Sequence, residues 1–304
     1  MSEIVVVGSL NMDLVVTVAR WPEAGETVIG GRFATMPGGK GANQAGAAAA
    51  LGGHTAMIGR VGEDEFGKDL CQTLTALGVD VSRVTRTPQE TSGVAIIGVD
   101  DAGENRIVVV SGANARLRPQ DLEGVDWGGV KVLLLQLEIP LDTVAEAARA
   151  AHESGVTVIL DPAPPRQLPA EIWSSVDIVT PNIVEAGILV GHPISSVEDA
   201  CQAARSMVQR LRCAVVVKVG ADGAVICQQG AVSHLGGHRV NVVDTTAAGD
   251  VFAGALAVAL AEGSSLDAAV GTANLAAALS TTKPGALPSV PSRGDLAAEV
   301  EMRG

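Results

Sequence analysis

The chain has 304 residues and a formal net charge of −13, and aromatic residues make up only 2% of it. An acidic chain with so few rings suits neither a phosphate backbone nor base stacking, so we expect no nucleic-acid partner. Hydrophobic residues account for 47%, which is enough for the core of one large α/β domain with a small appended part.

The N-terminus and the cysteines favour a cytoplasmic protein. Residues 1–9, MSEIVVVGS, carry an acid and too short an apolar run for a signal peptide. No later run has the length of a membrane span, so we expect no membrane partner. The four cysteines form no C-x-x-C pair, which predicts free thiols in a reducing compartment.

Apolar runs that predict buried parallel strands alternate with helical patterns along the chain. The predicted strands cover residues 4–9, 55–62, 131–138, 157–163, 177–182 and 214–220. Helical periodicity covers residues 65–79, 141–155 and 197–211, and the chain from about residue 247 is mostly helical. This alternation predicts an α/β fold with a doubly wound, mostly parallel sheet flanked by helices.

Two stretches break the alternation. Residues 14–36 and 92–111 alternate apolar and polar side chains, and the second contains the turn sequence DDAGEN. We interpret both as antiparallel ribbons outside the main sheet that form a small lid. No linker or repeat divides the rest, so residues 1–304 are predicted to be a single domain with this lid.

Polar residues follow several predicted strands, in NMD (11–13), QLE (136–138), DPAP (161–164) and PN (181–182). Because ligands of open α/β sheets bind at the carboxyl ends of the strands, we expect these residues to share a site. A single polar residue after a strand is usually only part of a loop.

The glycine turn MPGGKGANQAG, residues 36–46, leads into an alanine-rich helix. Gly38, Gly39 and Gly41 either let a ligand approach the backbone or serve a tight helix-packing turn, and the pattern fits both interpretations equally. It is not a Walker A loop, since Ala34 and Gly41 stand where that motif needs Gly and Ser or Thr.

The stretch VDTTAAGDVFAGAL, residues 243–256, places small residues before an apolar helix. Such a start exposes backbone N–H groups at the positive end of the helix dipole, which is an anion hole. Asp250 would repel the anion unless it takes a proton from an attacking hydroxyl. An anion hole beside a base suits phosphoryl transfer to an alcohol, whereas the alternative is a helix with an Asp in its first turn.

These motifs together resemble the ribokinase family, also called the PfkB carbohydrate kinases, along essentially the whole chain. GGKGANQAGAAAALGGHTAMIGRVG (38–62) is similar to the family's N-terminal signature, and DTTAAGDVFAGAL (244–256) is similar to its highly specific C-terminal signature. NMD, LLLQLEIP (133–140) and KPGALPSVP (283–291) resemble the ribokinase branch of the family.

The resemblance implies ATP-dependent, in-line phosphorylation of D-ribose to D-ribose 5-phosphate. Related acceptors such as fructose, deoxyribose or adenosine are the alternatives, and a non-catalytic sugar sensor is a third class of function. A nucleoside kinase would need aromatic stacking, for which the chain has three Phe and three Trp. A sensor has no use for a base such as Asp250.

Roles for individual residues also come from the resemblance. Asp250 would be the base, with the anion hole at Ala247, Ala248 and Gly249. The sugar would be bound by Asn11, Asp13, Gly39, Lys40, Gly41, Asn43, Glu138 and Asp250. ATP would contact Asn182, Lys218, Val219, Gly220, Ala221, Asp222, Gly223, Gly249 and Asn274.

The resemblance further implies two metal ions and a dimer. Glu185 would organise Mg²⁺ through water, although Ile183 stands where the family often has a second acid. A monovalent cation, usually K⁺, would lie at Asp244, Thr246, Ser280, Lys283, Gly285 and Ser289. The lid would also clasp a second copy to form a homodimer.

Overall fold

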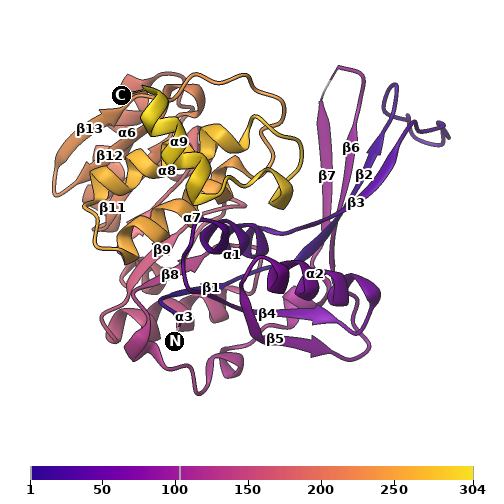
Figure 1. Cartoon of the computed structure of the whole chain (residues 1–304), viewed down its shortest axis with the longest axis horizontal. Coiled ribbons are helices and arrows are strands. Elements are labelled where there is room, and N and C mark those ends of the chain that lie inside the picture. Colours follow the sequence, from indigo (N-terminus) through magenta and orange to yellow (C-terminus); the bar gives the residue numbers. More distant parts are fainter. Residues whose placement is uncertain (1, 103, 304) are drawn as a thin grey trace.

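A computed structural model describes residues 2–102 and 104–303, and these form two β-sheets with helices around the larger one (Figure 1). The larger sheet has nine strands in the order β13-β12-β11-β10-β9-β8-β1-β4-β5. Their bounds are β1 Ile4–Val7, β4 Thr55–Gly62, β5 Asp80–Thr87, β8 Val132–Leu135, β9 Thr157–Leu160, β10 Ile178–Val179, β11 Ala214–Lys218, β12 Ala224–Gln228 and β13 Ala231–Leu235.

The strand pairing confirms the predicted doubly wound, mostly parallel sheet. The strands from β11 to β5 pair in parallel, and β12 and β13 are added antiparallel at one edge. All six predicted strands are present, whereas β5, β12 and β13 were not predicted. Strand β5, DVSRVTRT, lies at the opposite edge and carries charged residues, so it lacks the continuous apolar run of a buried strand.

Helices cover both faces of the sheet and bury two hydrophobic clusters. One cluster packs beneath α1, α2, α7 and α8, and the other beneath α3, α4, α5 and α6. The helices are α1 Lys40–Ala50, α2 Glu65–Ala76, α3 Leu141–Glu153, α4 Ala170–Trp173, α5 Ile183–Val190, α6 Val197–Leu211, α7 Ala248–Ala261, α8 Leu266–Ser280 and α9 Arg293–Arg303. Among the described residues, none of these helices has the length and apolar character needed to cross a membrane.

Small side chains bring α1 and α7 close together. A Cβ added at Gly254 of α7 would lie 2.7 Å from the Cβ of Ala47 and 2.9 Å from the carbonyl oxygen of Gln44, both in α1. The alanines and glycines of both helices are therefore needed for backbone approach. This approach holds the first turn of α7 against the first turn of α1.

The second sheet has the order β3-β2-β6-β7 and projects from the body of the molecule (Figure 1). It consists of β2 Asn11–Thr17, β3 Phe33–Gly38, β6 Gly93–Val99 and β7 Asn105–Val110. The two predicted ribbons are thus present outside the main sheet, and parallel pairing of β2 with β6 joins them. That this sheet acts as a lid on a single domain stays a prediction.

Candidate active site

Polar side chains converge at the carboxyl ends of β1, β8, β9 and β11, next to the end of the second sheet that joins the body of the molecule. Glu138, after β8, is the centre of one group. Its Oε2 accepts hydrogen bonds from Ser9 Oγ at 2.5 Å, from the Lys40 backbone N–H at 3.2 Å and from Asn11 Nδ2 at 3.4 Å. Asn114 Nδ2 in turn donates to Asn11 Oδ1 at 2.8 Å, so the Asn11 amide is held from both sides.

A second group surrounds Asp250 in the first turn of α7. Asn43 Nδ2 donates to Asp250 Oδ2 at 3.1 Å, and Gln44 Nε2 donates to Oδ1 at 3.1 Å. The Asn43 Oδ1 atom is buried and has no hydrogen-bond partner within the described chain. A buried amide oxygen without a partner is costly, so a donor from a ligand would complete it.

Mutual repulsion and burial shift the pKa values of this acidic pocket. Burial raises the pKa of Asp13 to about 7, helped by the negative charges of Glu138 and Asp250. Burial also raises the pKa of Asp250, although Lys40 and the amides of Asn43 and Gln44 oppose the rise. Burial acts to lower the pKa of Lys40, but the surrounding carboxylates, Asp250 foremost, raise it above its usual value, so its side chain stays charged.

The raised pKa of Asp13 predicts a stability cost that grows with pH. The free energy of unfolding falls as pH rises from the unfolded pKa of 3.8 to the folded value of about 7, because only the unfolded carboxyl then loses its proton. We expect Asp13→Asn to remove this cost and to raise the free energy of unfolding at pH 8 by roughly 1–3 kcal/mol. Urea unfolding at pH 4 and pH 8 measures it, and an equal gain at both values would contradict the assignment.

The predicted anion hole lies at the start of α7. Ala247, the N-cap residue, is in the left-handed region with φ 59°, and because alanine has no side-chain acceptor the helix begins without a side-chain cap. The N–H groups of Asp250 and Val251 are taken by the Ala247 carbonyl oxygen, each at 2.9 Å. Ahead of them, the Ala248 N–H donates to the Thr245 carbonyl oxygen at 3.3 Å, whereas the Gly249 N–H stands at a position that has no partner inside a helix. A Cβ on Gly249 would lie 3.3 Å from Lys218 Nζ, so the Lys218 ammonium borders this turn.

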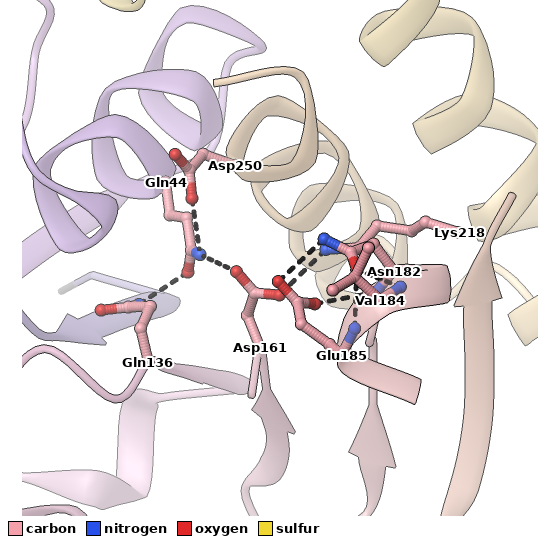
Figure 2. Close-up of polar contacts among 8 residues, drawn as sticks. All are labelled: Gln44, Gln136, Asp161, Asn182, Val184, Glu185, Lys218 and Asp250. Carbon is pink, nitrogen blue, oxygen red and sulfur yellow. Dashed lines mark hydrogen bonds and ion pairs between the residues drawn. The ribbon is translucent and has the colours of Figure 1, made fainter. Parts of the chain in front are cut away.

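Asn182 and Glu185 form a reciprocal cap at the start of α5 (Figure 2). Asn182 Oδ1 accepts from the backbone N–H groups of Val184 and Glu185, both at 2.9 Å. Glu185 accepts from Asn182 N at 2.8 Å and from Asn182 Nδ2 at 2.9 Å. A structural role alone therefore explains the pair, and burial raises the pKa of Glu185. An isolated bridge to Lys218 places the pair beside β11.

The other predicted nucleotide residues gather beside β13. The loop 218–223 contains a 3₁₀ turn, Gly220–Asp222, and a Cβ on Gly223 would lie 2.1 Å from the Leu235 carbonyl oxygen. Asn274, on α8, donates to the same oxygen at 3.5 Å. Loop and helix therefore meet at the end of β13.

The residues predicted to hold a monovalent cation converge in part. Asp244 accepts from Thr246 N at 2.9 Å, from Thr246 Oγ1 at 2.7 Å and from Gly285 N at 2.8 Å. These bonds hold the pKa of Asp244 below its usual range despite its partial burial. Ser280 and Ser289 are buried, and their hydroxyls donate to the carbonyl oxygens of Ala277 and Ala286, which leaves the lone pairs of the hydroxyl oxygens as well as the backbone oxygens as donors to an ion. Lys283 is exposed.

The glycine turn before α1 has a packing role. Gly39 has φ 89°, and its added Cβ would lie 2.6 Å from the Asn11 backbone nitrogen. A Cβ on Gly41 would lie 2.6 Å from the Ser9 backbone nitrogen, and one on Gly38 would lie 2.4 Å from Asp13 Oδ2. Of the two interpretations, the structure supports the packing turn, while contact of Gly39 and Gly41 with a sugar stays a prediction.

Several residues of this pocket have no predicted role. Gln44, Gln136 and Asp161 form a buried hydrogen-bonded group next to Asp250. Gln136 and Asp161 were marked only as polar strand ends. Ser9 and Asn114, which support Glu138 and Asn11, had no signal in the sequence beyond their polarity.

Comparison with known proteins adds to this geometry. The model for the pfkB family of carbohydrate kinases matches residues 1–293. The chain belongs to this family. A relative, ribokinase of Haemophilus influenzae, is 39% identical over 290 residues, which cover 95% of each chain. Deoxyribokinase of Salmonella typhimurium is 36% identical over 293 residues, covering 95% of this chain and 96% of its own.

Solved structures of family members agree with the fold. Arabidopsis thaliana ribokinase, complexed with ribose and ATP, superposes with a TM-score of 0.90 at 36% identity, covering 98% of each chain. The chain is therefore a carbohydrate kinase of an ATP-using family with this α/β architecture. The predicted roles of individual side chains stay predictions.

Proposed function

We propose that this pfkB family member transfers the γ-phosphoryl group of ATP to the 5-hydroxyl of D-ribose, giving D-ribose 5-phosphate and ADP. The observation that carries the proposal is the buried Asp250 carboxylate at the start of α7, with the unpartnered Asn43 Oδ1 beside it. Similarity to ribokinases over nearly the whole chain supports ribose as the acceptor.

In the proposed mechanism the sugar lies between Glu138 and Asp250. Asn11, Asp13 and Asn43 accept from or donate to its hydroxyls, because carboxylates accept and amides do both. The attacking hydroxyl passes its proton to Asp250 as its oxygen bonds to the γ-phosphorus and the bond to ADP breaks. The Gly249 N–H stabilises the charge on the transferring phosphoryl oxygens, joined by the Ala248 N–H once its long bond to the Thr245 carbonyl oxygen opens.

The charge of the pocket makes a divalent cation part of this proposal. Two cationic side chains, Lys40 and Lys218, stand among the carboxylates Asp13, Glu138, Asp161, Glu185 and Asp250. ATP would enter a negative field, so Mg²⁺ bound to its phosphates would supply the missing positive charge. Carboxylate oxygens suit a hard cation, and we assign Glu185 to organise Mg²⁺ through water.

The segments around Asp244 suit a monovalent cation such as K⁺. A carboxylate and backbone carbonyl oxygens are the donors that hard cations prefer. The bonds from Thr246 and Gly285 to Asp244 hold these segments together beside α7. A cation there would offset the charge of Asp244 and strengthen the neighbouring anion hole.

An acceptor panel tests the proposed function. We expect ATP-dependent ADP release to be strongest with D-ribose and to be higher in potassium than in sodium buffer. Deoxyribose is the main rival, because a deoxyribokinase is also 36% identical to the chain, and fructose and adenosine complete the panel. Preference for another acceptor would overturn ribose as the substrate, and ADP release with none would favour a sensor.

Gly249→Ala should crowd the anion hole. Its new methyl group would lie 3.3 Å from Lys218 Nζ, so either the lysine or the first turn of α7 must move. We expect kcat to fall roughly 10- to 100-fold, less than for loss of an oxyanion donor, with a small change in the sugar KM. Gly271→Ala on α8, where a Cβ would meet nothing within 4 Å, is the matched control. A change in sugar KM alone would place the anion hole elsewhere.

The second sheet offers a surface for the predicted homodimer. Every residue of edge strand β7 is exposed, and Ile107, Val108 and Val109 are 53%, 61% and 47% exposed. An apolar edge strand of this kind pairs readily with another copy. We expect Val108→Lys to shift the protein from dimer to monomer in sedimentation velocity, and a wild-type monomer would contradict the dimer.

We also propose a cytoplasmic location. Cys71, Cys201, Cys213 and Cys227 are all free, as is typical of proteins in a reducing compartment.

A further inference from the structure

A continuous bridge of buried polar side chains connects Asp250 with Lys218 (Figure 2). Gln44 Nε2 donates to Asp250 Oδ1 at 3.1 Å and to Asp161 Oδ2 at 3.1 Å. The other Asp161 oxygen, Oδ1, accepts from Lys218 Nζ at 2.9 Å. The four residues come from α7, α1, the end of β9 and the end of β11, so the bridge exists only in the folded chain.

The orientation of the Gln44 amide is determined by its neighbours. Its two N–H protons face two carboxylates, and its Oε1 accepts from Gln136 Nε2 at 2.6 Å. A flipped amide would turn its oxygen toward Asp161 and Asp250 and its nitrogen toward a donor, which loses all three bonds. Gln44 is fully buried, so no water replaces them at the surface.

We propose that Gln44 and Asp161 are positioning residues of the phosphoryl transfer, with Gln44 aiming the carboxylate of the base Asp250 and Asp161 aiming the ammonium of Lys218. The Lys218 ammonium borders the first turn of α7 at Gly249. One amide and one carboxylate thereby hold the proposed proton acceptor and a cation beside the same helix turn. This inference rests on the proposed function, in which Asp250 is the base.

Burial raises the pKa of Asp250 most, and the bridge adds two opposing contributions to it. The charged groups around Asp250 are Lys40 at the start of α1, Asp161 after β9 and Asp13 on β2. Glu138 lies next to Asp13 and Lys40, Glu185 lies near Lys40 and Asp161, and Lys218 pairs with Asp161. The negative charge of Asp161 raises the pKa of Asp250, whereas the hydrogen bond from Gln44 lowers it. Removing the charge of Asp161 should therefore lower the pKa of Asp250, whereas removing the hydrogen bond from Gln44 should raise it.

The test compares Asp161→Asn with Gln44→Met by carbon NMR of the aspartate carboxyls in the unliganded protein. Asp250→Asn identifies the signal of Asp250. We expect its titration to move to lower pH in Asp161→Asn and to higher pH in Gln44→Met. Gln136→Met, which frees the Gln44 amide, should move it in the same direction as Gln44→Met and keeps the test open if that variant does not fold.

Kinetics provide the second measurement. The acid limb of the pH profile of kcat should move to lower pH in Asp161→Asn and to higher pH in Gln44→Met. Even at the pH where its kcat is highest, Gln44→Met should be roughly 10- to 100-fold slower than the wild type, as expected for a misplaced base. Thr143→Val, on α3, is the control, because it removes a buried hydrogen bond from the Thr143 hydroxyl to the Leu117 carbonyl oxygen and involves none of the residues of the bridge. It should lower stability and leave the titration of Asp250 in place.

The two measurements separate failure of the inference from failure of the proposed function. If the pKa of Asp250 moves in opposite directions in Asp161→Asn and Gln44→Met but no acceptor is phosphorylated, the influence of the bridge on Asp250 is supported and the proposed function is overturned. Turnover with NMR shifts of the same sign, in only one variant or in neither would overturn the positioning role of Gln44 and Asp161.

Discussion

Asp250→Asn is expected to lower kcat roughly 10²- to 10⁴-fold, the range for loss of a general base. The asparagine amide keeps the size of the side chain but cannot take a proton from the sugar hydroxyl. It also turns an N–H group toward one of two donors, Asn43 Nδ2 or Gln44 Nε2, so one hydrogen bond is lost. Steady-state ADP release at saturating ribose and ATP measures the effect.

Asp267→Asn is the matched control for this substitution. Asp267 also lies in the first turn of a helix, α8, but its Oδ1 accepts from Ser233 on β13 at the surface. We expect its kcat to equal that of the wild type. Near-normal turnover of Asp250→Asn would remove Asp250 from its role as the base.

Gly39→Ala is expected to cause a large loss of stability, roughly 2–4 kcal/mol in the free energy of unfolding. Alanine is strained at φ 89°, and its Cβ would lie 2.6 Å from the Asn11 backbone nitrogen and 3.1 Å from Leu10. Backbone cannot swing aside as a flexible side chain can, so the turn between β1 and β2 must move. Urea unfolding followed by circular dichroism measures the loss.

Gly78→Ala separates the two causes of that loss. Gly78 has the same φ of 89°, but a Cβ there would meet nothing within 4 Å. We expect it to cost about 1 kcal/mol, the strain of the left-handed region alone. An equal cost at both positions would mean that the contact with Asn11 is relieved without penalty.

The main elements could be predicted from sequence because most strands of the sheet are buried on both faces. Strands β1, β4, β8 and β11 therefore appear as continuous apolar runs. Strand β5 was missed because it lies at an edge with charged side chains. Strand β13 lies at the other edge and is not fully buried, so it lacks a continuous apolar run, whereas β12, AVICQ, was missed although its pattern is that of a buried strand.

The candidate site was predicted unevenly for a related reason. Asp250 follows a run of small residues that a capped helix alone does not require, so a role as base could be predicted, and that role stays a prediction. Gln44 is an amide inside an alanine-rich helix, and its partners Asp161 and Asp250 are distant in sequence. Only the fold brings them together. The choice between a packing turn and a ligand-binding turn at Gly39 likewise depended on the Asn11 backbone nitrogen, which would lie 2.6 Å from an added Cβ. No local sequence pattern encodes that contact.

The connections between the second sheet and the body of the molecule are very short. β1 passes into β2 through residues 8–10, and β3 passes into α1 through Gly39. Three predicted sugar-binding residues lie at or next to these connections: Asn11, Asp13 and Lys40. A sugar bound there would contact the end of the second sheet that joins the body of the molecule, and not its far end. A small change of angle at a pivot becomes a large displacement at the far end. If the second sheet moves as the predicted lid, occupancy of the predicted sugar pocket would thus displace β7 and any second copy paired with it.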